Sequence, residues 1–171
     1  MSDRDLERRI ELLEDERAIQ ALLHRYATLC DQRYAPDPLA ELFTEDAVWS
    51  SASPDGSLDF GTWHGREAIR EFFQEVTARI AQPTLHMVSA PEIDMAPDRE
   101  SATGRWYTVV LLTMEEGPGQ AAEVLMLGGT YAHDYRRVGG AWRFSRVAAT
   151  LDFHLPVGAG VIPAVSARHD R

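Results

Sequence analysis

SATGRWYTVVLLTMEEGPGQAAEVLMLGGTYAHDYRRVGGAWRFSRVAATLDFHL, residues 101–155, is the stretch that decides the fold. It is rich in β-branched and aromatic residues. Gly117-Pro118-Gly119 and Gly139-Gly140 interrupt it, which is typical of strands joined by tight turns. With the apolar segment before it, it predicts four long strands, over residues 85–95, 101–115, 121–138 and 141–155. Long consecutive strands joined in this way form an antiparallel meander, and we expect this one to curve.

Helical patterns precede these strands. Apolar residues recur every three or four positions from Leu6 to Cys30, which predicts one long helix, or two in series, over residues 3–30. Two prolines, Pro36 and Pro38, end the pattern. The segments that follow predict a helical turn over 38–43, a strand over 47–50, an extended piece over 61–65 and a helix over 66–80.

Helices followed by a long antiparallel sheet indicate the α+β class. A strongly curved sheet with helices across its concave face forms a cone with an open mouth, which is suited to a small-molecule pocket. The length of 171 residues suits one domain, which we place at residues 1–155. Residues 156–171, rich in Gly, Pro and Ala, are interpreted as a C-terminal tail that is loosely packed or contacts a partner.

The charge and composition of the chain indicate which classes of partner and which cellular location to expect. The net charge is -10 at pH 7, which disfavours nucleic acid and anionic membranes as partners. No apolar run approaches the roughly 20 residues that span a bilayer, and the charged N-terminus is unlike a signal peptide, so a cytoplasmic location is expected. Cys30 is the single cysteine, so no intrachain disulfide forms, and we interpret it as a buried structural thiol.

Three residues are candidates for one acid-base site: Asp31 at the end of the first helix, His86 in the strand over 85–95, and Tyr26. A carboxylate that orients an imidazole produces a base, and a nearby phenol can donate a proton. Spacing alone leaves the alternatives open. Five residues on an unbroken helix separate Tyr26 from Asp31 by about 140°, so the two share a face only if the helix ends near Cys30. Spacing on its own favours ordinary structural roles: a core aromatic for Tyr26, a helix-end acid for Asp31 and a core histidine for His86.

Other chemistries find less support in the sequence. No spacing typical of a zinc site or a metalloprotease occurs, and the glycine pairs match neither a phosphate-binding loop nor a dinucleotide fingerprint. No Gly-x-Ser-x-Gly elbow is present. These absences favour acid-base chemistry with neither metal nor cofactor. His133 alternates with Tyr131 and Tyr135 along one strand face, which makes it a second candidate for the pocket.

A family resemblance rests on several segments. These are ALLHRY at 21–26 with Cys30-Asp31, LFTEDAVW at 42–49, GREAI at 65–69, His86, ATGRWY at 102–107, GTY at 129–131 and GAWRF at 140–144. Together they resemble the SnoaL-like branch of the nuclear transport factor 2-like superfamily, over residues 5–155. Within it the chain is similar to three kinds of lyase: bile acid 7-alpha-dehydratase, scytalone dehydratase and gamma-hexachlorocyclohexane dehydrochlorinase.

The resemblance implies roles for particular residues. In all three lyases an Asp-His pair is the base of an elimination, which here implies Asp31 and His86. The bile acid enzyme has a functional tyrosine at the position of Tyr26, where the dehydrochlorinase has a lysine. An arginine of the dehydrochlorinase matches Arg137. Where the bile acid enzyme has an acid and an arginine, this chain has Val110 and Leu151, so its pocket is more apolar and its reaction is expected to differ.

The sequence therefore predicts a cofactor-free, dehydratase-like lyase whose Asp-His dyad takes a carbon-bound proton from a small hydrophobic molecule. The expected substrate-binding residues are Trp49, Trp106, Val110, Tyr131, His133, Arg137 and Leu151. The alternatives are an isomerase or polyketide cyclase on the same fold, a non-catalytic small-molecule-binding protein, and a structural subunit. The resemblance also implies a homo-oligomer, either a dimer or a trimer.

Overall fold

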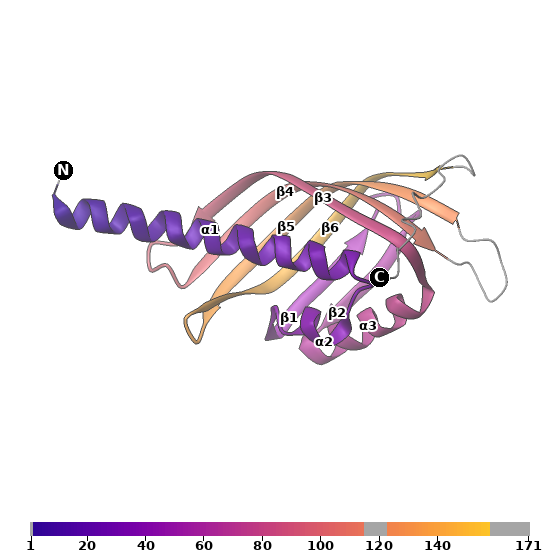
Figure 1. Cartoon of the computed structure of the whole chain (residues 1–171), viewed down its shortest axis with the longest axis horizontal. Helices are drawn as coiled ribbons and strands as arrows, with labels where there is room; N and C mark the ends of the chain where they lie inside the picture. The colour runs from indigo at the N-terminus through magenta and orange to yellow at the C-terminus, as the bar shows by residue number, and fades with distance from the viewer. Residues whose placement is uncertain (1, 115–122, 158–171) are drawn as a thin grey trace, which may run out of the picture.

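The computed structural model describes residues 2–114 and 123–157. Three helices and six strands follow in the order α1 (Asp3–Asp31), α2 (Pro36–Ala40), β1 (Phe43–Ala52), β2 (Asp59–His64), α3 (Arg66–Arg79), β3 (Ile80–Met95), β4 (Ser101–Met114), β5 (Glu123–Val138) and β6 (Ala141–Val157). The strands form one curved, unclosed sheet in the order β2-β1-β6-β5-β4-β3, and the helices lie against one of its faces (Figure 1). The predicted α+β class is confirmed.

The predicted meander is present as β3, β4, β5 and β6, each antiparallel to the next. Strand β1 joins it through a parallel pairing with β6 and is longer than the predicted strand over 47–50. Strand β3 starts at Ile80, immediately after α3, rather than at residue 85. Pro83 therefore lies inside a strand, which is tolerated because β3 is an edge of the sheet.

The long helix α1 starts with a capping box, in which Ser2 and Asp5 satisfy each other's backbone N–H groups. It ends at Asp31, and the next residues turn sharply because Arg33 and Tyr34 both adopt the left-handed conformation, with φ of 70° and 51°. Such backbone is costly for residues other than glycine, so the surrounding packing must enforce it. The Thr77 side chain of α3 contributes, since its hydroxyl lies 2.9 Å from the Tyr34 carbonyl oxygen.

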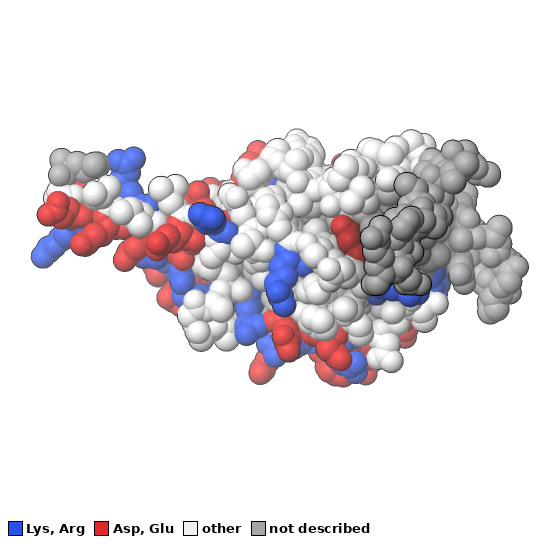
Figure 2. Space-filling view, in the orientation of Figure 1, with Lys and Arg blue, Asp and Glu red and all other residues white. Residues whose placement is uncertain are grey.

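The N-terminal part of α1 projects beyond the sheet (Figure 1), where acidic and basic side chains gather along it (Figure 2). Leu6, Ile10 and Leu13 are exposed there, although their spacing predicts a buried face. None of the described helices is long and apolar enough to cross a membrane.

Below this projection, α1 is fastened to the sheet through the buried carboxylate of Asp15. Its Oδ2 accepts a hydrogen bond from Arg99 at 2.8 Å, and its Oδ1 accepts from Arg137 and, at 3.1 Å, from Trp142 Nε1. The Arg137 guanidinium also lies over the Trp142 ring, 4.6 Å from its centre. This Asp15 cluster fixes where α1 lies along the sheet.

The predicted turn at residues 117–119 and most of the predicted tail over 156–171 lie outside the described residues. Only Pro156 and Val157 of that tail are described, and they complete β6.

Candidate active site

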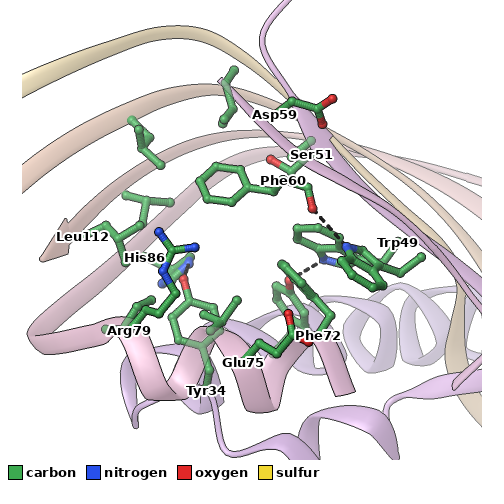
Figure 3. Close-up of a pocket in the computed structure, with 18 of the residues that line it drawn as sticks. Tyr34, Trp49, Ser51, Asp59, Phe60, Phe72, Glu75, Arg79, His86 and Leu112 are labelled. Carbon is green, nitrogen blue, oxygen red and sulfur yellow. Dashed lines mark hydrogen bonds between the residues drawn. The ribbon is translucent and has the colours of Figure 1, made fainter. Parts of the chain in front are cut away.

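A cavity of about 260 Å³ opens between α3, the end of α1 and the concave face of the sheet. Most of its wall is apolar or aromatic (Figure 3). The polar side chains that reach it are few: three tyrosines, Ser51, His86 and, nearer the mouth, Asp59, Glu75 and Arg79. The apolar lining consists of Trp49, Phe60, Trp63, Phe72, Val76, Ile80, Val110, Leu112, Leu127, Ala149 and Leu151.

Asp31 and His86 meet at the edge of this cavity. The two residues are 55 positions apart in the chain, and His86 Nδ1 lies 2.8 Å from Asp31 Oδ1. The same oxygen also accepts the backbone N–H of His86 at 2.8 Å, so strand β3 is fastened to the last residue of α1. Because a carboxylate oxygen only accepts, Nδ1 donates to it, and in the neutral imidazole Nε2 carries the lone pair.

Tyr34 occupies the other side of the imidazole. Its hydroxyl lies 3.1 Å from His86 Nε2 and donates to that lone pair. Burial raises the pKa of Tyr34 well above the usual range of a phenol, so this hydroxyl stays protonated at neutral pH. The side chains of Asp31, His86 and Tyr34 thus form one continuous hydrogen-bonded chain that ends at the cavity, and we refer to it as the Asp31–His86–Tyr34 chain.

Tyr26 also reaches the cavity, from one turn before the end of α1. Its hydroxyl accepts a hydrogen bond from Trp49 Nε1 at 3.0 Å, and its ring packs edge-on against Phe144 at 5.6 Å between centres. Burial raises the pKa of Tyr26 well above its usual value. The cavity is therefore lined by protonated phenols that can donate to an oxygen of a bound molecule.

Of the other predicted site residues, Trp49, Val110, Tyr131 and Leu151 line the cavity. Trp106, His133 and Arg137 do not line it. Trp106 and His133 are buried elsewhere in the core, and Arg137 is half-buried. Trp106 Nε1 donates to the Tyr135 hydroxyl at 3.1 Å, and that hydroxyl lies 2.9 Å from His133 Nδ1, so these three form a separate buried group. Arg137 lies at the end of β5 and belongs to the Asp15 cluster.

His133 makes stability depend on pH. Burial, aided by the charge of Arg146, lowers the pKa of His133 from 6.5 to about 3, so the unfolded chain gains a proton there over that pH range and the folded chain does not. Acidification from pH 6.5 toward 3 should therefore cost roughly 1.4 kcal/mol of unfolding free energy per pH unit. We expect His133→Phe to flatten this slope in urea titrations at several pH values.

The matched control for that experiment is His64→Gln, an exposed histidine on β2. It should leave the slope unchanged. An equal slope in His133→Phe and the wild-type protein would show that His133 takes up a proton in the folded state, contrary to its burial.

Several cavity residues are absent from the sequence-based prediction, with Tyr34, Phe72 and Arg79 the most important. Phe72 was recognisable as part of the apolar face of α3, and only the position of α3 decides that it borders a cavity. Tyr34 lies in the segment that ends α1, where the sequence signals a turn without giving its direction. Among the described residues, no group of three or more His, Cys, Asp or Glu side chains is placed to hold a metal ion.

Comparisons with known proteins concern the fold and the family of the chain. No curated protein matches the chain. Among solved structures, hexachlorocyclohexane dehydrochlorinase LinA type 2 is 21% identical with a TM-score of 0.75, and the match covers 91% of this chain and 99% of that one. A candidate scytalone dehydratase from Novosphingobium aromaticivorans is 24% identical with a TM-score of 0.69, over 84% and 87% of the two chains.

An NTF2-like protein with a cystatin-like fold, also from Novosphingobium aromaticivorans, is 25% identical with a TM-score of 0.64, over 88% and 90% of the two chains. These similarities confirm the predicted fold. A family model described as a SnoaL-like domain matches residues 11–148, which is most of the sequence. The chain therefore belongs to the SnoaL-like domain family.

Proposed function

We propose that this protein is a cofactor-free lyase that eliminates water, or a comparable leaving group, from a small hydrophobic molecule. The observation that carries the proposal is the Asp31–His86–Tyr34 chain at the edge of an apolar cavity. Two of the similar structures bear the names dehydrochlorinase and scytalone dehydratase, and both names describe eliminations.

In the proposed mechanism, the Tyr34 hydroxyl turns from His86 Nε2 to the leaving group of the bound molecule, and Nε2 is then the base. Asp31 holds the Nδ1–H tautomer and stabilises the imidazolium that forms when Nε2 takes a proton from carbon. The electrons of the broken C–H bond form the new double bond, and the leaving group departs from the neighbouring carbon. An apolar wall keeps water from competing for the base.

Tyr34 completes the cycle in this proposal. Its protonated hydroxyl can donate to the departing hydroxide, which leaves as water. The resulting phenolate lies within hydrogen-bond distance of the imidazolium, because the two atoms are 3.1 Å apart before reaction. The proton that Nε2 took from carbon then passes to Tyr34, so both groups return to their starting states. Tyr26, held by Trp49, is placed to donate to a carbonyl oxygen that gains negative charge.

A β-hydroxytetralone is a direct test, since loss of water produces a fluorescent naphthol. We expect the wild-type protein to form naphthol above the buffer rate, and Tyr34→Phe to lower kcat by roughly 10²-fold, a typical loss for one proton donor. The ring and its stacking on Phe73 remain in that variant, so folding should be unaffected.

Two results would count against this proposal. Failure of the wild-type protein to turn over any of a panel of β-hydroxy and β-halo ketones would argue against a lyase. Exchange of the carbon-bound proton with deuterated water, without elimination, would support the isomerase alternative, which begins with the same proton abstraction.

A further inference from the structure

Arg79, the last residue of α3, carries a positive charge into a cavity that is otherwise mostly apolar. Within residues 2–114 and 123–157, no carboxylate lies within 4.0 Å of its guanidinium. Glu75, one turn earlier on the same helix, also lines the cavity, and a pair at this spacing commonly forms on a helix surface. Here the two side chains diverge, and Arg79 is directed to the cavity instead.

Its position relative to the base is informative. In Figure 3 the Arg79 guanidinium is on the same side of the cavity as His86 and Tyr34, while Asp59 lies at the opposite edge. A guanidinium presents several N–H donors in a planar fork that matches the two oxygens of a carboxylate. The carboxylates of Asp59 and Glu75 repel an anion from the rest of the mouth, which leaves the Arg79 side as the favourable place for one.

We infer that the substrate of this site is an apolar molecule bearing a single anionic group, such as a carboxylate, that pairs with Arg79. This inference rests on the proposed function for the identity of the site and adds the class of substrate. The apolar body would lie along Trp49, Phe72 and Leu151, and the anion beside Arg79 would hold the reacting carbon near His86 Nε2. Arg79 is thus a specificity-determining residue.

The probe pair for this inference is naphthoate and naphthamide, which share a ring system and differ in charge. Binding is followed by quenching of tryptophan fluorescence, since Trp49 and Trp63 line the cavity. We expect the wild-type protein to bind naphthoate more tightly than naphthamide by roughly three- to tenfold, a modest ratio because Arg79 is exposed to water. Arg79→Gln should abolish the preference, and Arg79→Lys should restore part of it.

Glu75→Gln is the matched control, because it removes a charge of opposite sign from the same helix and the same cavity. It should preserve the preference for naphthoate or increase it. Equal affinities for the two probes, a preference that survives Arg79→Gln, or no binding of either probe would overturn the inference. None of these measurements requires turnover, so equal affinities for the two probes in a wild-type protein that dehydrates a hydroxytetralone would reject this inference alone.

Discussion

His86→Gln is expected to lower kcat/KM for β-hydroxytetralone dehydration by roughly 10²–10⁴-fold, the usual contribution of a positioned general base. Glutamine retains a polar side chain of similar reach, but its amide is a poor base. The backbone N–H of His86 would still donate to Asp31, which keeps β3 attached to the end of α1. The measurement is the rate of naphthol formation, with the melting temperature recorded for each variant.

Asp31→Asn should have a loss of similar size for a different reason. The asparagine amide can donate to Nδ1, which favours the opposite tautomer and places a proton on the nitrogen that faces Tyr34 and the cavity. The lone pair that removes the substrate proton is then absent. A single oxygen, Oδ1, accepts both hydrogen bonds from His86, so an amide nitrogen in its place also loses the backbone bond. An amide oxygen in its place keeps both bonds but lacks the charge that stabilises the imidazolium.

His64→Gln is the control for both variants, because His64 is exposed on β2 and does not line the cavity. It should retain full activity. If His86→Gln or Asp31→Asn dehydrates the substrate at the wild-type rate, the dyad is not the base and the mechanism is wrong. If both are inactive but melt far below the wild-type protein, His86→Asn provides a second variant in which to separate chemistry from folding.

The sequence predicted much of the fold because its signals there are local. Apolar spacing at three and four residues predicted α1 almost to its last residue, Asp31. Glycine turns between long apolar segments predicted the meander, and alternation predicted that Tyr131, His133 and Tyr135 share one strand face, without saying which face is buried. One face of a helix or strand is buried along its whole length, so apolar residues recur there at a regular spacing that can be recognised in the sequence.

The site was predictable only where a residue's position follows from such patterns or from the family resemblance. The spacing of Asp31 and His86 does not predict their contact, which depends on β3 running beside the end of α1. Tyr34 reaches the imidazole because two successive residues adopt left-handed backbone, a choice that tertiary packing makes. Alternation along β5 predicts the face of Arg137, but the position of α1 decides that it meets Asp15 rather than the cavity.

The Asp15 cluster makes the second strong prediction: Asp15→Asn should lower the free energy of unfolding by about 2–4 kcal/mol. Removing one partner of a buried ion pair typically costs 3–5 kcal/mol, and partial exposure of Arg99 and Arg137 reduces this. For a chain of 171 residues the melting temperature should fall by roughly 5–15 °C. Glu11→Gln is the matched control, since Glu11 pairs with the same Arg99 from an exposed position and should change stability by less than about 1 kcal/mol.

The pH dependence gives this prediction a second readout. Burial alone would raise the pKa of Asp15, but hydrogen bonds from Arg137, Trp142 and Arg99 outweigh it and hold the pKa below the usual 3.8. A carboxyl whose pKa is lowered by folding stabilises the fold above its unfolded pKa and loses that contribution as the pH falls through the folded value. The difference between the wild-type protein and Asp15→Asn should therefore be full near pH 7 and shrink below about pH 4.

The cluster also bears on the site, because α1 is continuous from Asp15 to Asp31, which are about 24 Å apart along the helix axis at 1.5 Å per residue. A helix fixed at Asp15 cannot slide, so Asp31 stays within hydrogen-bond distance of His86. We expect Asp15→Asn to lower kcat/KM only slightly at temperatures where the variant is folded, and to make activity fail at a lower temperature than in the wild-type protein. A variant as stable as the wild-type protein at pH 7 would mean that the buried pair contributes no more than its desolvation costs, and the position of α1 would then have to come from apolar packing alone.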